Sequence, residues 1–301
     1  MPRSGNPRSV AEIAVDLNKV IRYFETLGIS LMRGRIRAYS EALDAAQRGE
    51  HVDRAILWSA ACEVSDLVAA SSLGSAAIQP VLYRLATICG GDPVFTAKSG
   101  HDPGRNLCFE LITAAMLQAI EVRTELQGPS DVTSYVGDAR LLVECKRPTT
   151  LSALGRRLKE GYRQLSEHRR RGHVGFGAIA LEVSALVNPD FGVLVAKDAA
   201  TAMHYVYGHI QKVFQHSAEC LARAARNARR DAGVHLLLFR VQCMTGDDIG
   251  PPNVTQVWHL EPMVQLSSPE FQALYELMKK QPAFTPDVMV IDPNDSRLPQ
   301  V

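Results

Sequence analysis

Closely paired cysteines are missing from this chain of 301 residues. Its six cysteines, at positions 62, 89, 108, 145, 220 and 243, form no Cys-x-x-Cys pair, and most stand among apolar residues. This spacing argues against a disulfide framework and against a zinc site. It favours reduced thiols and a cytoplasmic location.

Long apolar runs are also missing. The first residues, MPRSGNPRSV, contain no apolar signal core, and the longest apolar region, 174–195, is interrupted by Glu182 and by Asn188-Pro189-Asp190. We therefore expect no membrane span.

Phosphate-binding loops are the third absence. No Gly-x-x-x-x-Gly-Lys-[Ser/Thr] segment occurs, and the glycines of Gly175-Phe176-Gly177 lie within a predicted strand instead of opening a helix. Nucleotide binding through either motif is not expected. The net charge is only +1, so nucleic-acid binding would have to come from local basic clusters.

The composition, 46% hydrophobic and 22% charged, is that of a globular protein with a substantial core. Residues 1–95 are predicted to form an all-α N-terminal subdomain, because apolar residues recur at helical spacing and Gly90-Gly91-Asp92-Pro93 ends the pattern. Arg33, Arg35 and Arg37 fall in the connection 31–38, where we favour a solvated loop over a phosphate contact.

A new helix is predicted to begin at Asp102-Pro103, a typical N-cap followed by proline at the first helical position. Glu110 lies among small and apolar residues on one face of this helix. It is therefore either exposed at the edge of that apolar face or buried with a polar or metal partner for its carboxylate. Residues 121–127 alternate and predict a short strand, with continuation of the helix to Leu126 as the alternative.

Residues 131–136 and 139–146 predict a β-hairpin around Gly137-Asp138. Side chains alternate along a strand, so Glu144 and Lys146 share one face of an otherwise apolar segment. Two charges there cost free energy unless they are paired or bind a ligand. A surface ion pair is one reading; the other adds the carboxylate of Asp131 and gives an oxygen-rich site suited to Mg²⁺.

At these residues the chain resembles the PD-(D/E)XK nuclease superfamily, which has the restriction-endonuclease-like fold. The resemblance rests on Pro129-Ser130-Asp131, on Glu144-Cys145-Lys146 and on the preceding helix with Glu110, and it spans residues 102–187. It implies an α/β fold over residues 96–301, with a mixed β-sheet core flanked by helices.

The resemblance also implies a Mg²⁺-dependent endonuclease, with Mn²⁺ able to substitute, that hydrolyses phosphodiester bonds. DNA is favoured over RNA as the substrate, and prokaryotic defence or repair as the role. Asp131, Glu144, Glu110 and the backbone carbonyl of Cys145 would bind the metal, while Lys146 would orient or help to deprotonate the attacking water. The alternative is a non-catalytic module of the same fold that binds nucleic acid or protein, with the helical N-terminal region as the surface for a partner or a second copy.

Basic residues are concentrated after the hairpin, where residues 146–173 contain nine Lys or Arg against two Glu. Much of this segment is predicted to be a helix that begins after Thr149-Thr150. Its basic side either lies next to a phosphate backbone or is merely solvated. The candidate nucleic-acid contacts are Arg147, Arg156, Arg157, Lys159, Arg163 and Gln164.

The remaining segments complete the expected order. We predict a long strand over 174–187, helix over 199–230, strands over 234–243, 254–266 and 287–291, and a helix over 269–280.

Overall fold

The computed structural model describes residues 9–94, 102–120, 122–126, 128–136, 139–188, 193–195, 199–228, 234–246, 253–263, 269–279 and 288–291. The longer helices are α1 (Val10–Thr26), α2 (Gly34–Gln47), α3 (Arg54–Ser71), α6 (Pro103–Ala119), α7 (Leu151–Arg170), α9 (Ala199–Ala228) and α10 (Pro269–Lys279). The short ones are α4 (Ser75–Ile78), η1 (Gln79–Val81), α5 (Leu82–Leu85), η2 (Ala86–Cys89) and α8 (Ser184–Val187). The strands are β1 (Arg123–Glu125), β2 (Val132–Val136), β3 (Ala139–Lys146), β4 (Phe176–Glu182), β5 (Val193–Val195), β6 (Val234–Gly246), β7 (Asn253–Pro262) and β8 (Val288–Ile291).

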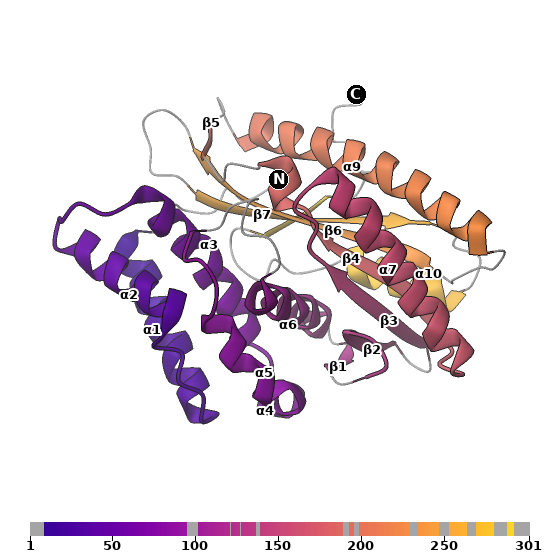
Figure 1. Cartoon of the computed structure of the whole chain (residues 1–301), viewed down its shortest axis with the longest axis horizontal. Coiled ribbons are helices and arrows are strands. Elements are labelled where there is room, and N and C mark those ends of the chain that lie inside the picture. Colours follow the sequence, from indigo (N-terminus) through magenta and orange to yellow (C-terminus); the bar gives the residue numbers. More distant parts are fainter. Residues whose placement is uncertain are drawn as a thin grey trace.

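The described strands form one mixed sheet of eight, in the order β1-β2-β3-β4-β6-β7-β8, with β5 paired to β6. The first three strands are an antiparallel meander, whereas β3, β4 and β6 are parallel neighbours. The chain is therefore a mixed α/β protein with helices on both faces of its sheet (Figure 1).

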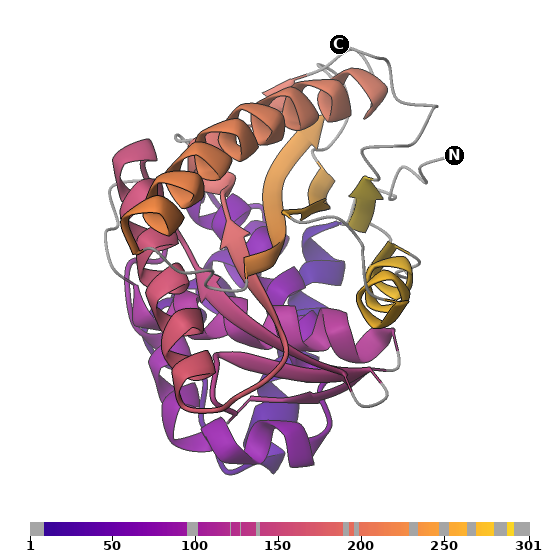
Figure 2. The same cartoon turned by 90° about the vertical axis from the view of Figure 1, so that its right-hand side faces the viewer.

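Helices cover both faces of the sheet because β3, β4 and β6 direct apolar side chains to each face. Leu142, Ile179 and Leu237 pack under α7 and α9. Their neighbours in sequence, among them Val143, Ala178 and Leu238, join the core formed with α1, α2, α3 and α6. In Figure 2, α7 and α9 lie on the side of the sheet away from the N-terminal helices.

Local chemistry explains several helix starts. The side chain of Asp102 accepts a hydrogen bond from the backbone of Arg105, with proline at the first helical position, so α6 begins as predicted. Thr150 caps α7 in the same way through the backbone of Ala153. The hairpin, the strand β1 and the helices α9 and α10 are confirmed within a few residues, although Gly137-Asp138 lies outside the described residues.

Two expectations about local structure were wrong, and one strand was missed. The predicted strand 174–187 ends at Glu182, because the backbone and hydroxyl of Ser184 bind the Glu182 carboxylate and the chain turns into α8. The expected loop 31–38 is already helix α2 from Gly34, and Arg35 in it is buried instead of solvated. Strand β5 was not predicted.

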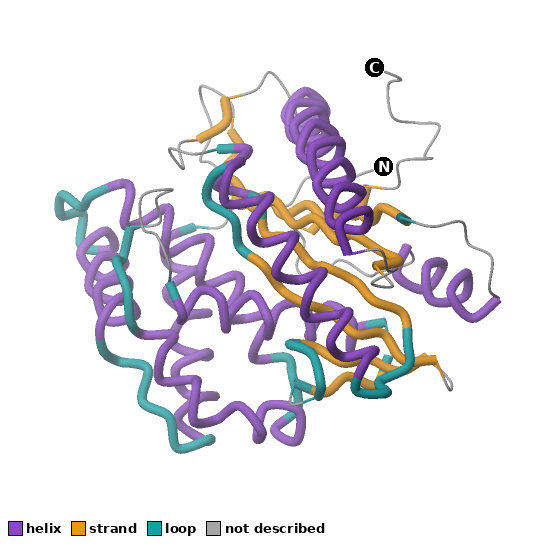
Figure 3. Tube along the Cα trace, turned by 45° about the vertical axis from the view of Figure 1, so that its right-hand side comes forward, coloured by secondary structure: helices purple, strands orange, loops and turns teal. Residues whose placement is uncertain are grey.

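The helical N-terminal region and the sheet share one hydrophobic core. The buried residues of this cluster run from Ile13 in α1 through α6 to Tyr275 in α10. Figure 3 shows the helices of the first part packed beside the orange strands. The two parts are therefore in continuous contact. The division of the chain into domains at residue 95 stays a prediction.

Candidate active site

The β2–β3 pairing brings Asp131 next to Glu144 and Lys146. Val132 pairs with Val143, so Asp131, one residue earlier, stands beside the end of β3. Its Oδ2 accepts a hydrogen bond of 2.8 Å from the backbone N–H of Cys145. This contact holds the carboxylate of Asp131 at the carboxyl end of β3.

One ammonium group joins the two carboxylates. Nζ of Lys146 donates to Oε2 of Glu144 at 3.0 Å and to Oδ2 of Asp131 at 3.3 Å. The side chains of Glu144 and Lys146 are 2% and 7% exposed, whereas that of Asp131 is 28% exposed. The cluster is therefore buried at its base and open to solvent on the side of Asp131.

Burial and like charge both act on Glu144. Desolvation, followed by the negative charge of Asp131, raises the pKa of Glu144 to about 7, although Lys146 opposes both effects. Desolvation would lower the pKa of Lys146, but the two carboxylates outweigh it and raise that pKa above its usual value. Lys146 is thus a protonated donor here, which suits it to orient and stabilise charge but not to act as a base.

Glu110 belongs to the same site but has its own cation. Both of its oxygens accept hydrogen bonds from Arg84 of α5, at 2.9 and 2.8 Å. Desolvation raises the pKa of Glu110 to about 7 despite Arg84, and Asp131 contributes to the rise. Arg84, which the sequence analysis missed, connects the helical N-terminal region to the site.

His168 is a second residue that sequence analysis missed. Its Nε2 lies 3.0 Å from Oε1 of Glu144, whereas Lys146 contacts the other oxygen, Oε2. Desolvation lowers the pKa of His168, and its Nδ1 has no hydrogen-bond partner within the described part of the chain. The only signal in the sequence is its position four residues after Gln164, on the same face of α7.

The donor chemistry of this site fits a divalent cation. Asp131 and Glu144 both contact the Lys146 ammonium, so their oxygens lie close to one point. Glu144 is buried there beside the like charge of Asp131, and a divalent cation would compensate the two carboxylates better than one ammonium does. As placed, however, no three His, Cys, Asp or Glu side chains of the described ranges are arranged as a metal-binding group. The carboxylate oxygens nearest this point accept hydrogen bonds from Lys146 and Arg84.

The predicted nucleic-acid contacts divide into two groups. Arg156, Lys159 and Arg163 are exposed on α7, and Arg163 is ion-paired with Glu167 at 3.7 Å. Arg157 is half-buried with Glu160 at 2.9 Å, and Gln164 is half-buried with its Oε1 unpaired among the described residues.

Arg147 lies apart from this group. Its side chain is 12% exposed, and its Nε donates to Glu182 at 3.3 Å. It faces the interior between the sheet and α6, not the solvent.

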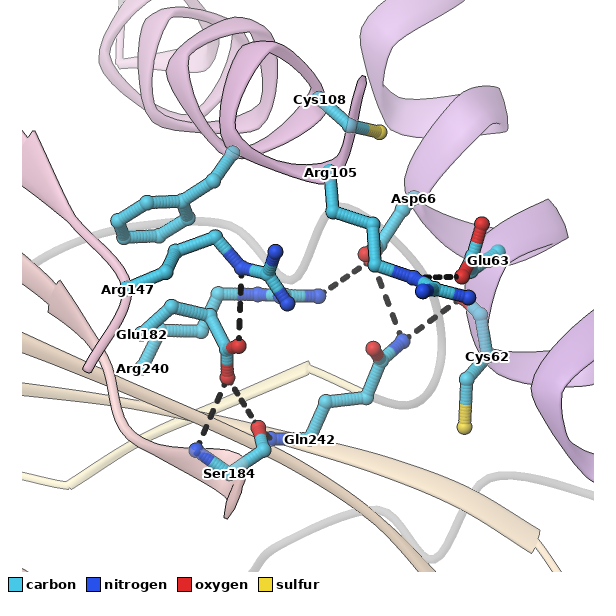
Figure 4. Close-up of a pocket in the computed structure, with 11 residues that line it drawn as sticks. Cys62, Glu63, Asp66, Arg105, Cys108, Arg147, Glu182, Ser184, Arg240 and Gln242 are labelled. Carbon is cyan, nitrogen blue, oxygen red and sulfur yellow. Dashed lines mark hydrogen bonds and ion pairs between the residues drawn. The ribbon is translucent and has the colours of Figure 1, made fainter. Parts of the chain in front are cut away.

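Arg147 belongs to a buried charge network around a cavity of about 30 Å³ (Figure 4). Asp66 of α3 is at its centre and accepts hydrogen bonds from Arg240, Gln242 and Gln256. Such a cavity has room for a few water molecules but not for a substrate. Its charges connect α3 to the carboxyl ends of the parallel strands.

The network continues into the N-terminal helices. Arg105 donates to Glu63 and, at 2.9 Å, to Asp102. Arg35 donates to Asp102 at 2.9 Å, and its Nε lies 2.9 Å from Glu63, although this N–H is not aligned for a hydrogen bond. Each buried charge has an opposite charge beside it, which is the condition for burying it.

We expect the cation-free protein to become more stable as the pH falls from about 8 to about 5. Burial raises the pKa of Asp66 to about 6, and those of Glu110 and Glu144 to about 7. Between pH 8 and pH 5 the folded state therefore binds more protons than the unfolded state. The free energy of unfolding rises as each group becomes protonated, by about 1.4 kcal/mol for each unit by which its pKa is raised. The lowered pKa of His168 acts in the opposite direction.

Urea denaturation in EDTA at several pH values measures this dependence. Glu110→Gln removes one of the three groups and should give a shallower rise than the wild type. A wild-type stability that falls steadily from pH 8 to pH 5 would contradict the expectation.

Within the described residues, no helix is both long and apolar enough to cross a membrane. Comparison with protein-family models, with curated proteins and with solved structures finds no match to this chain. The arrangement of Asp131, Glu144, Lys146, Glu110 and His168 is therefore what indicates a function.

Proposed function

We propose that this protein is a metal-dependent nuclease that hydrolyses phosphodiester bonds in nucleic acid, with DNA favoured over RNA. The observation that carries the proposal is the convergence of Asp131 and Glu144 on Nζ of Lys146 at the end of a strand, with Glu110 nearby. Two carboxylates, a lysine and an open side are the parts that such a reaction needs.

The order of elements around the site supports the same proposal. Helix α6, strands β1 to β3, helix α7 and strand β4 follow one another, and the site lies where β2 and β3 meet. This order resembles the core of the restriction-endonuclease-like fold, which we propose for residues 96–301.

Each site residue has a role in the proposed reaction. Asp131, Glu144 and Glu110 would hold a Mg²⁺ ion, or Mn²⁺ in its place, together with the backbone carbonyl of Cys145. When bound, such an ion would lower the pKa of a water ligand and neutralise charge on the phosphate. Lys146 orients the attacking water and stabilises negative charge in the transition state. His168 positions Glu144 through their 3.0 Å contact.

Substrate binding is assigned to the exposed basic side of α7. Arg156, Lys159 and Arg163 point away from the hydrophobic core and are available to phosphate oxygens. Arg147 is not part of this surface, because it is paired with Glu182 in the interior.

A cleavage assay on the purified full chain tests the proposal. Supercoiled and linear duplex DNA, single-stranded DNA and RNA are incubated with Mg²⁺, Mn²⁺ or EDTA. We expect cleavage with either cation, none in EDTA, and a loss of about 100-fold or more in Glu144→Gln. Cleavage that persists in EDTA or at the wild-type rate in Glu144→Gln would overturn the proposal.

One observation favours a second candidate, a non-catalytic module that binds nucleic acid or a partner protein. Arg84 donates to both oxygens of Glu110, and Lys146 donates to the other two carboxylates, so each carboxylate has a hydrogen-bond partner without a metal ion. Binding of nucleic acid with no turnover under Mg²⁺ or Mn²⁺ would support this candidate.

A further inference from the structure

Arg84 reaches the site from the helical N-terminal region. It lies on the short helix α5, whose neighbouring residue Tyr83 is 79% exposed, so this surface is open to a ligand. The side chain of Arg84 is 35% exposed, whereas its partner Glu110 is 9% exposed. The guanidinium thus lies between solvent and the buried carboxylate.

The Arg84–Glu110 pair has the bidentate geometry that arginine commonly makes with carboxylates. Nη1 and Nη2 donate to Oε2 and Oε1 of Glu110 at 2.9 and 2.8 Å. A phosphodiester offers the same pair of oxygens to a guanidinium. A nucleic-acid phosphate can therefore replace Glu110 as the partner of Arg84 without loss of hydrogen bonds.

Such an exchange would change the site beneath. While Arg84 donates to both oxygens of Glu110, its positive charge opposes a second cation at this carboxylate and takes up one lone pair of each oxygen. Helix α6, which carries Glu110, packs against β2 and β3, and the charges of Asp131 and Lys146 act on Glu110. Its release therefore makes a third carboxylate available to the cluster. Phosphate binding and cation binding then favour each other.

We propose that Arg84 binds a nucleic-acid backbone phosphate and, by leaving Glu110 to do so, couples nucleic-acid binding to cation binding. This inference rests on the proposed function. It adds a substrate contact from the helical region, and it has nucleic acid release Glu110 from Arg84 before this carboxylate binds the cation. In the absence of nucleic acid, the pairing of Arg84 with Glu110 weakens cation binding at the site.

The experiment measures the coupling and not only cleavage. Fluorescence anisotropy gives the Kd of a labelled DNA oligonucleotide at pH 8, once in EDTA and once in saturating Ca²⁺. Ca²⁺ is the probe because it binds oxygen ligands. The DNA is checked for cleavage after each titration. The ratio of the two Kd values is the coupling factor, and we expect it to be about fivefold or more in the wild type.

Three variants are compared with the wild type. Arg84→Ala should weaken DNA binding in Ca²⁺ and lower the coupling factor at least about threefold, because Glu110 is free before DNA arrives. Arg84→Lys keeps the charge but loses the paired geometry, so its coupling should be intermediate. Arg37→Ala removes a matched arginine, 66% exposed and paired with Glu41, and should behave as the wild type.

Melting curves in EDTA show whether each variant is folded. If Arg84→Ala is folded and keeps both the DNA affinity and the full coupling factor, Arg84 is only structural and the inference is overturned. Cleavage in Mg²⁺ reports separately on the proposed function. A wild type that cuts DNA while Arg84→Ala keeps full coupling overturns the role of Arg84 alone, and a wild type with neither cleavage nor coupling overturns both proposals.

Discussion

Lys146→Met is expected to abolish metal-dependent cleavage while strengthening cation binding. Methionine keeps most of the volume of the lysine stem but removes the ammonium that lies 3.0 Å from Glu144 and 3.3 Å from Asp131. The transition state then lacks a charged donor, which costs about 100-fold or more in rate. Asp131 and Glu144 lose their shared cation and attract a divalent one more strongly.

The loss of Lys146 should also be visible in stability. Two adjacent carboxylates, one of them 2% exposed, are left without a cation, so the variant should melt well below the wild type in EDTA. Added Mg²⁺ or Mn²⁺ should restore more stability to the variant than to the wild type, because binding to the folded state adds to its free energy of unfolding.

Cleavage rates and cation-dependent melting curves measure these two effects. Lys19→Met is the matched control, since Lys19 is 72% exposed and also lies 3.0 Å from a carboxylate, that of Asp16. It should change neither property. Cleavage by Lys146→Met at the wild-type rate would remove Lys146 from the mechanism, and unchanged cation affinity would show that Asp131 and Glu144 do not hold the ion.

The candidate site was accessible from sequence because its main parts are local. Asp131, Glu144 and Lys146 lie within one hairpin, and alternation along β3 is enough to place the last two on one face. The cost of desolvating charges in an apolar strand indicated that they needed partners. Arg84 and His168 were missed because they come from separate helices and no local pattern relates them to Glu144 or Glu110.

The buried charge network was missed for the same reason on a larger scale. Arg35 was read as a residue of a solvated loop, since its partners Glu63 and Asp102 are distant in sequence. Yet the argument applied to Glu144 holds equally for Glu182 and Arg240, each of which interrupts an apolar strand segment. Such charges can be recognised as needing partners, but only tertiary structure shows which ones.

Arg240→Met is expected to cost about 3 to 5 kcal/mol in free energy of unfolding at neutral pH. Arg240 is 2% exposed, is paired with Asp66 and lies with its guanidinium carbon 6.0 Å from the centre of the Trp258 ring. Its loss leaves the buried Asp66 carboxylate, among the described residues, with hydrogen bonds from the amides of Gln242 and Gln256 at 3.2 Å. Amides solvate a buried charge less well than a guanidinium does.

A double-mutant cycle measured by urea denaturation isolates this pair. Asp66→Asn with Arg240→Met should cost less than the sum of the single variants, by about 0.5 to 3 kcal/mol, because neither charge remains alone. Arg48→Met is the surface control: Arg48 is 60% exposed and pairs with Glu50 at 2.6 Å, and its loss should cost far less than that of Arg240. Costs for Arg240→Met as small as those of the control would mean that the network contributes little.

The pH dependence of Arg240→Met distinguishes an unpaired charge from a packing defect. Burial raises the pKa of Asp66, and Arg240 is the main influence that lowers it. Without Arg240 the carboxyl should take up a proton at a higher pH and escape the cost of a buried charge. The destabilisation by Arg240→Met should therefore shrink as the pH falls from 8 to 5, whereas a cost due to lost packing alone would stay constant over that range.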